Sequence, residues 1–285
     1  MTQSNLTKDG YRQAQAITKK YATTFYFASH FLSKEKRLAA YAIYAICRLT
    51  DESVDSPSPL TANELQNTAK RISDAYSQSN SADPICLAFR ETIHKYKIPK
   101  EYFDELIAGM YMDLDKNRYS NFNELYQYCY RVAGVVGLIM LHIFGFKDQR
   151  AKNYAINLGI AMQLTNILRD IKEDLLRGRI YLPHDEMLAY GISEMQFSEG
   201  TIDDTWKAFM QFQIGRAKKY YAQSSEGINL ITDRKSRFVT RAMKEIYAGI
   251  LDKIIKNHYD CLNKRAYVSI LGKVIIILKI ILKNK

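Results

Sequence analysis

Three acids fall within five positions of "CRLTDESVDS", residues 47–56, at the end of a run dominated by Ala, Ile and Tyr. Residues four apart in an α-helix lie about 40° apart around the axis and about 6 Å apart along it, so Asp51 and Asp55 share one face. Arg48 and Tyr44 extend the same stripe in steps of three and four residues. Carboxylates beside an apolar wall are costly unless a cation holds them there, which makes this stripe a candidate binding site.

A second polar stripe lies in "AMQLTNILRDIKEDLLRGRIYLP", residues 161–183, again after an apolar run. Its oxygen-bearing side chains are spaced i, i+4 and i+8, namely Asn166, Asp170 and Asp174. Gln163 falls near the same face, and Arg169 flanks it. Acids and a cation therefore recur together at helical spacing.

Two oxygen-rich stripes on two helices suit a hard cation such as Mg²⁺, which takes carboxylates, waters and substrate phosphate oxygens rather than a complete protein cage. Facing helices of a bundle commonly build such sites, and nearby arginines take phosphate oxygens that the metal leaves free. The alternative is an ordinary solvated helix face, which is the better interpretation of "DESVD" taken alone. The recurrence of the pattern on two apolar helices favours a metal–diphosphate site.

The elements that must position these stripes are helical, because apolar residues recur at helical spacing and no stretch shows sustained alternation. The predicted helices cover residues 8–30, 34–55, 61–79, 83–97, 99–116, 122–145, 148–176, 201–230, 233–262 and 265–283. All five prolines precede residue 184, and the linkers are short. The sequence predicts an all-α bundle that forms a single domain over residues 1–285.

The net charge of +11 is typical of proteins that bind nucleic acid, anionic membranes or phosphorylated small molecules. No block of basic residues, zinc-finger spacing or RNA motif occurs, so we expect no nucleic acid partner. Four scattered cysteines without a CxxC pair indicate reduced, buried thiols, and the polar N-terminus does not read as a signal peptide. We therefore expect a cytoplasmic protein without structural zinc.

Three stretches resemble the squalene and phytoene synthases, which are all-α isoprenoid synthases that join two prenyl diphosphates head to head. They are "TTFYFASHFLSKEKRLAAYAIYAICRLTDESVD" (23–55), "GMYMDLDKNRYSNFNELYQYCYRVAGVVGLIMLHIFG" (109–145) and "AMQLTNILRDIKEDLLRGRIYLP" (161–183). Within the family, "CRLTDESVD", "GMYMDL" and "RGRIYLP" look most like bacterial phytoene synthases. The resemblance implies a helical isoprenoid synthase fold with a central active-site cavity.

The resemblance also implies roles for individual residues. The metal-binding residues would be Asp51, Asp55, Asn166, Asp170 and Asp174. The diphosphate contacts would be Arg48, Arg169 and Arg265, and the residues lining the reaction centre Tyr44, Tyr130, Gln163 and Tyr181. Thr24 and Phe25 match a stretch that closes over the substrate. This chain departs from the common pattern at Glu52, where many members carry Asp, and at Ala22, where a hydroxyl is frequent.

The implied reaction converts two geranylgeranyl diphosphates to phytoene through prephytoene diphosphate, with Mg²⁺ or its substitute Mn²⁺ as the cofactor. The alternative is a C15 version that makes presqualene diphosphate, dehydrosqualene or squalene from farnesyl diphosphate. NADPH would be needed only if the product is squalene. A monomer or weak dimer is expected. A non-catalytic helical scaffold is the rival interpretation, and the intact acids argue against it.

The last stretch, "AYVSILGKVIIILKIILKNK" (266–285), is rich in Ile, Leu and Val but interrupted by lysines. Its apolar runs are too short for a membrane span of about 20 residues. A helix lying in the membrane interface fits the pattern, with lysines reaching anionic headgroups and the protein held on the inner face of the membrane. A last bundle helix that packs on the core fits it equally. Both would hold if residues 265–270 pack on the core and the remainder dips into lipid.

Overall fold

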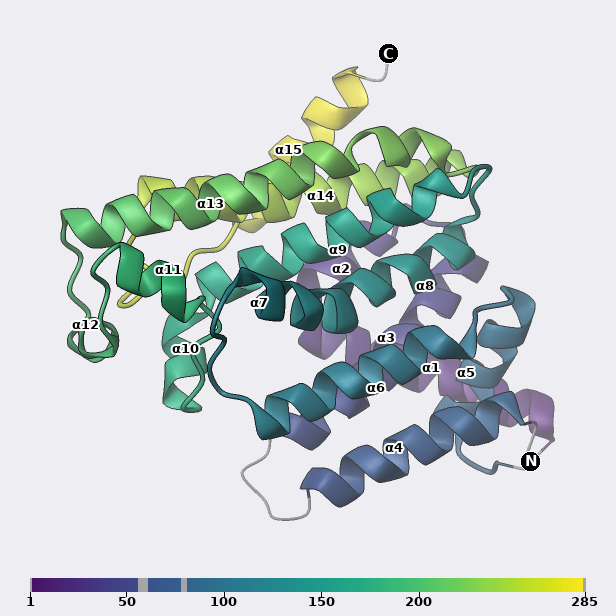
Figure 1. Ribbon diagram of the computed structural model, residues 1–285. Coiled ribbons are helices and arrows are strands. Elements are labelled where there is room, and N and C mark those ends of the chain that lie inside the picture. The colour runs from purple at the N-terminus through teal and green to yellow at the C-terminus, as the bar shows by residue number, and fades with distance from the viewer. Residues whose placement is uncertain (1, 56–60, 78–80, 284–285) are drawn as a thin grey trace.

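The computed structural model describes residues 2–55, 61–77 and 81–283, and at residues 50–55, 61 and 283 it describes the backbone but not the side chains. Helices dominate the described chain (Figure 1). No strand occurs in these ranges, where the β-type pairings are two isolated bridges, Arg118–Ile180 and Phe146–Ile231. The predicted all-α fold is confirmed.

The helices follow one another along the chain with short connections. They are α1 (Gln3–Tyr21), α2 (Thr23–Ser29), α3 (Lys34–Asp55), α4 (Thr61–Tyr76), α5 (Pro84–Lys95), α6 (Lys100–Asp115), α7 (Phe122–Cys129), the π-helix η1 (Tyr130–Gly134), α8 (Val135–Phe144), α9 (Arg150–Arg169), α10 (Ile171–Leu176), α11 (His184–Ala189), α12 (Glu194–Glu199), α13 (Asp204–Ser224), the 3₁₀-helix η2 (Glu226–Leu230), α14 (Arg234–Lys256) and α15 (Ile270–Lys283).

Side-chain caps fix where several of these helices begin. The Asp83 carboxylate accepts from the Ile85 amide at 2.8 Å, and Pro84 occupies the first helical position, where no N–H is needed. Asp203 and Asp233 cap α13 and α14 in the same way, and Asn121 caps α7. Each such cap typically stabilises a helix start by about 1 kcal/mol. The starts of α5, α7, α13 and α14 are therefore fixed by local chemistry.

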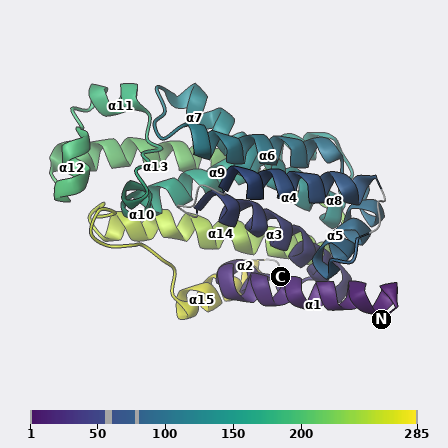
Figure 2. The same ribbon diagram turned by 90° about the horizontal axis from the view of Figure 1, so that it is seen from below.

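Helix α9 lies at the centre of the bundle, between α8 on one side and α13 and α14 on the other (Figures 1 and 2). It approaches η1 and α8 so closely that glycine is required at two positions. A Cβ on Gly159 would lie 2.2 Å from the Ala133 carbonyl oxygen, and one on Gly137 would lie 2.4 Å from that of Ala155. This close approach fixes α9 against η1 and α8.

Two predicted helices are each interrupted where the structure needs a change of direction. The predicted helix 8–30 splits into α1 and α2 at Ala22, whose φ of −123° and ψ of 57° are not helical. The predicted helix 148–176 breaks at Asp170, with φ −105° and ψ 18°. Asp174 consequently sits in the short helix α10 rather than two turns further along α9, so the predicted i, i+8 relation on one straight helix is wrong.

The remaining corrections concern helix ends and short helices. α11 and α12 were missed, since helices of six residues are too short to show periodicity. The predicted helix 233–262 stops at Lys256, because His258 and Tyr259 adopt positive φ angles of 57° and 62°. The last helix begins at Ile270 rather than at residue 265. These differences leave the order of the long helices unchanged.

One continuous helical stretch, Phe122–Phe144, is long and apolar enough by length and composition to cross a membrane. Half of its apolar window is buried inside the protein, as is usual for a core helix. The four cysteines are free, and Cys86, Cys129 and Cys261 are buried. Burial raises the pKa of Cys86 to about 11 and that of Cys261 to about 12, which keeps both thiols protonated and unreactive.

Candidate active site

An apolar cavity of about 330 Å³ runs along α9, with walls from α3, η1, α8 and α14. Four of the predicted site residues line it, namely Phe25, Tyr44, Gln163 and Asn166. The rings of Phe25 and Tyr44 lie 6.3 Å apart between centroids, so the two aromatic side chains meet at one wall. The cavity therefore joins an aromatic wall to the polar end of α9.

The two amides on α9 face this cavity as a pair. The Asn166 amide nitrogen lies 3.4 Å from the Gln163 side-chain oxygen, to which it donates a hydrogen bond. The side-chain oxygen of Asn166 is buried and has no hydrogen-bond partner. A buried acceptor without a partner typically costs about 1–3 kcal/mol. Asn166 therefore presents an unsatisfied acceptor oxygen at the cavity wall.

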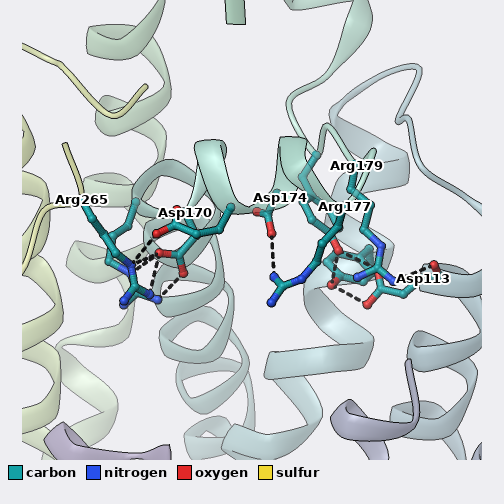
Figure 3. A network of polar contacts seen from close by, with 10 residues as sticks. Asp113, Asp170, Asp174, Arg177, Arg179 and Arg265 are labelled. Carbon is teal, nitrogen blue, oxygen red and sulfur yellow. Dashed lines mark hydrogen bonds and ion pairs between the residues drawn. The ribbon is translucent and has the colours of Figure 1, made fainter. Parts of the chain in front are cut away.

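Asp170 lies at the C-terminal end of α9, where two arginines converge on it (Figure 3). Arg169 donates to it from Nε at 2.7 Å and also through Nη2. Arg265 reaches the same carboxylate with Nε at 2.9 Å and Nη2 at 2.8 Å. Burial alone would raise the pKa of Asp170, but the hydrogen bonds and charges of the two arginines hold it below its usual range.

Asp174 lies one turn further along, in α10, with its side chain 16% exposed. Its nearest cation is Arg177, whose Nη1 is 3.8 Å from the carboxylate. Burial, together with the negative charge of Asp170, raises the pKa of Asp174 to about 7. The two carboxylates thus repel each other, and Figure 3 shows them next to each other, with Asp170 paired to Arg265 and Asp174 to Arg177.

The first predicted metal pair, Asp51 and Asp55, belongs to the helix α3, but its side chains lie outside the described residues. The described residues alone contain no cluster of three His, Cys, Asp or Glu side chains placed to hold a metal ion. The donors that α9 and α10 bring together are one amide oxygen and the carboxylates of Asp170 and Asp174. Helix α3 contributes Tyr44 to the cavity wall from the same stripe on which Asp51 and Asp55 fall.

Two further predicted residues, Arg48 and Thr24, belong to helices that line the cavity but do not line it themselves. The Arg48 guanidinium lies over the Tyr21 ring, 4.5 Å from its centroid. Thr24 is half-buried in α2, next to Phe25, which does line the cavity. Helix α2 therefore covers one side of the cavity, in keeping with the closing role that the resemblance implies for this stretch.

Tyr181 and Tyr130 take positions behind the wall rather than on it, as far as the described lining residues show. Tyr181 is 7% exposed and donates to Asp113 at 2.8 Å, while Tyr128 donates to the other oxygen of Asp113 at 3.0 Å. Tyr130 begins η1 and packs against the core cluster of α3, α6 and α8. These tyrosines support the elements that carry the site.

Sequence analysis missed two residues, one that lines the cavity and one that supports its wall from behind. Tyr247 lines the cavity from α14, along with Val239 and Met243, at the helical spacing i, i+4 and i+8. That spacing is visible in the sequence but is equally typical of a core-facing stripe. Asp113, in α6, accepts hydrogen bonds from the two buried tyrosines. An acid amid the apolar residues of "GMYMDL" was the available signal.

Comparisons with known proteins agree with this geometry. The family model of the squalene/phytoene synthases matches residues 18–271. The 15-cis-phytoene synthase of Synechococcus elongatus is 40% identical over 274 residues, which cover 91% of this chain and 88% of the relative. The phytoene synthase of Arthrospira platensis is 40% identical over 275 residues, with the same two coverages.

Solved structures share the fold over the whole chain. A dehydrosqualene synthase crystallised with a ligand superposes with a TM-score of 0.91 and 29% identity, covering 100% of both chains. The squalene synthase HpnC of Alicyclobacillus acidocaldarius has a TM-score of 0.83 at 23% identity, covering 89% of this chain and 96% of its own, and shows the fold alone. With the cavity, the acids and the extent of the match in agreement, this chain belongs to the squalene/phytoene synthase family.

Proposed function

We propose that this enzyme, a prenyltransferase, joins two geranylgeranyl diphosphates head to head and makes phytoene through prephytoene diphosphate, releasing diphosphate. The observation that carries the proposal is the 40% identity, over nine-tenths of the chain, to relatives named phytoene synthase. The cavity supports it, because its apolar walls suit prenyl chains and Asn166 on its lining comes one helical turn before Asp170, where two arginines meet.

The donors at this end suit a hard divalent cation. The partnerless Asn166 oxygen and the crowded carboxylates of Asp170 and Asp174 are oxygen ligands of the kind that Mg²⁺ prefers, and Mn²⁺ would substitute for it. These three residues would hold the metal, together with Asp51 and Asp55 if α3 contributes as its stripe predicts. When bound, such a cation supplies Lewis-acid neutralisation of the diphosphate charge.

The protein's own cations and aromatic rings do the remaining work in this proposal. Arg169 and Arg265 place fixed positive charge at the end of α9, where negative charge grows on a departing diphosphate. Phe25 and Tyr44 present aromatic faces to the cavity, which favour a cationic carbon chain. The apolar walls exclude water, which would otherwise quench such a cation.

The test is product analysis by mass spectrometry with purified enzyme and Mg²⁺, offering the C20 and C15 diphosphates separately, with and without NADPH. A C40 product from geranylgeranyl diphosphate that needs no NADPH is expected. A C30 product from farnesyl diphosphate alone would instead assign the C15 alternative, and a reduced C30 product appearing only with NADPH would assign squalene formation. Absence of diphosphate release from every substrate would favour the scaffold interpretation.

A further inference from the structure

The C-terminal helix α15 is apolar on two opposite faces. Its inner face carries Ile276, Ile277 and Ile280, and the last two side chains are 6% and 5% exposed. This face packs on Phe238 and Ala242 of α14 and on Phe27 of α2. The inner face is therefore fully used by the bundle, as predicted for a last packing helix.

The outer face of α15 is apolar as well, although no described part of the protein covers it. Its exposed residues follow the helical spacing i, i+3, i+4, i+7 and i+11, namely Leu271 (69% exposed), Val274 (38%), Ile275 (44%), Leu278 (53%) and Leu282 (69%). We call these five residues the outer stripe. Figures 1 and 2 place α15 outside the bundle, beyond α14, so the stripe points away from the protein. A contiguous exposed stripe of this kind marks an interaction surface.

The charges of the C-terminal segment that carries the outer stripe all have one sign. No acidic residue follows Asp260 in the sequence, whereas Lys and Arg occur at positions 264, 265, 273, 279, 283 and 285. Lys279 is exposed and lies about 80–100° around the helix from Leu271 and Leu278, at the edge of the stripe. A second copy of the chain docked on this face would bring like charges together. An anionic bilayer complements both the apolar stripe and the lysines.

We propose that the outer stripe of α15 docks the enzyme on an anionic lipid bilayer. The helix would lie in the plane of the interface, with its stripe among the acyl chains and Lys279 at the headgroups. A bilayer is favoured over the groove of a partner protein, because the stripe extends along the whole helix and every charged side chain after Asp260 is basic.

The outer stripe lies close to the cavity, which matters for product release if the proposed function holds. Helix α2 directs Phe25 to the cavity and Phe27 to α15, and α14 lines the cavity with Val239 and Met243 while it holds α15 with Ala242. A single helical layer thus separates the cavity from the docking surface. A water-insoluble product formed in the cavity would have only this layer between it and the bilayer.

The test is sedimentation of the full chain with vesicles of phosphatidylcholine alone or with phosphatidylglycerol. The variant L271Q/L278Q/L282Q removes three leucines from the outer stripe. The matched control L176Q/L188Q/M195Q removes three apolar residues that are equally exposed elsewhere, at 81%, 63% and 65%. We expect the wild type and the control to bind anionic vesicles alike, and the stripe variant to bind at least about ten-fold more weakly.

Depth of insertion gives a second readout, because the only tryptophan, Trp206, is fully buried. Brominated lipids should quench the fluorescence of L278W but not that of L188W. Equal vesicle binding by the wild type and the stripe variant, or equal quenching at both positions, would overturn the proposal. So would a stable dimer in light scattering that the stripe variant dissociates, with no vesicle binding by the wild type. None of these readouts uses turnover, which is measured separately in detergent, so loss of docking and loss of the proposed activity are distinguishable.

Discussion

Two arginine–carboxylate pairs are buried to the same degree in this protein, and only one of them belongs to the candidate active site. The side chains of Arg169 and Asp170 are each 18% exposed, and those of Arg216 and Glu186 are 15% and 16% exposed. Both pairs make a close bidentate contact. Burial and pairing alone therefore do not distinguish a site from a structural ion pair.

The pair at Glu186 is chemically complete. Its carboxylate accepts from Gln213 at 2.7 Å and from both terminal nitrogens of Arg216. The guanidinium is in turn sandwiched by Phe122 and Phe212, at 3.9 Å and 4.9 Å from the ring centroids. The groups that donate to this carboxylate belong to α13, so this pair locks α11 against α13.

The pair at Asp170 is surrounded by groups that remain incomplete. Two arginines share one carboxylate, Asp174 repels it from the next turn, and the Asn166 oxygen has no partner. The repulsion between the two acids and the partnerless oxygen are unfavourable in the free protein, and a ligand that carries charges of both signs would relieve them. The comparison teaches that a site is marked by unsatisfied polar groups next to a pair rather than by the pair itself.

The largest effect is expected from D170N, which keeps the size and one acceptor oxygen of the side chain. Removing this charge takes away a candidate metal ligand and releases Arg169 and Arg265 from their positions. We expect product formation to fall about 10²- to 10³-fold, as when a single preorganised group at a reacting centre is lost. Product formation by mass spectrometry and the melting temperature are measured on the same preparation. Near-normal turnover would remove Asp170 from the site.

The matched change in the structural pair is E186Q, which should act on stability instead. Breaking a buried pair leaves the Arg216 charge uncompensated, and a loss of about 3 kcal/mol in the free energy of unfolding is expected. Urea unfolding measures it, and turnover per folded molecule at low temperature should stay within about two-fold of the wild type. A large loss of turnover with unchanged stability would reverse the assignment of the two pairs.

In the metal-free protein, the repulsion between Asp170 and Asp174 should appear as a pH dependence of the free energy of unfolding. The pKa of Asp174 is raised from 3.8 to about 7, so the folded state holds a proton that the unfolded state releases near pH 4. The contribution of the protonated Asp174 side chain to folding stability is therefore fully present below about pH 4 and is progressively lost as the pH rises to 7. In EDTA at pH 8, D174N should be more stable than the wild type by about 2 kcal/mol, less than the full linkage value because Arg177 also loses its partner.

Thermal unfolding of both proteins from pH 4 to pH 8 checks this expectation. The two stability curves should converge at low pH and separate towards neutral pH. Added Mg²⁺ at pH 8 should stabilise the wild type more than D174N, because a cation that binds only the folded state shifts the unfolding equilibrium. Parallel curves over the whole range would mean that Asp174 is not in a crowded, buried environment.

Much of this arrangement could be predicted from the sequence. Helical periodicity indicated the long helices, and the spacing of Asn166, Asp170 and Asp174 indicated a ligand face. The break at Asp170 could not be predicted, because nothing in "LRDIKED" signals a helix end; neither glycine nor proline is present. Arg265 was assigned by resemblance, and only the folded chain brings it across 95 positions to Asp170.

The supporting residues were harder to predict than the site. Asp113 and Tyr181 are 68 positions apart, and their hydrogen bond depends on how α6 packs against the segment after α10. Tyr181 was expected at the reaction centre, but its hydroxyl points to Asp113 behind the wall. Periodicity places a residue on a face of its own helix, whereas the partner of that face is set by the packing of distant elements.

The smallest effect is expected from Y181F. This variant tests whether Asp113 is a fully satisfied structural group like Glu186 or belongs to the candidate active site like Asp170. The substitution removes a hydroxyl that donates to Asp113 at 2.8 Å but leaves the ring stacked on Tyr128, with centroids 5.0 Å apart. A loss of about 1 kcal/mol in the free energy of unfolding is expected, with turnover within a few-fold of the wild type.

The control is Y119F, since the Tyr119 hydroxyl is buried without a partner and its removal should leave stability unchanged or raised. Because both rings sit in the same stacked cluster, the difference between the two variants isolates the hydrogen bond. A hundred-fold loss of turnover in Y181F at unchanged stability would instead place this hydroxyl in contact with the substrate and Asp113 among the incomplete groups.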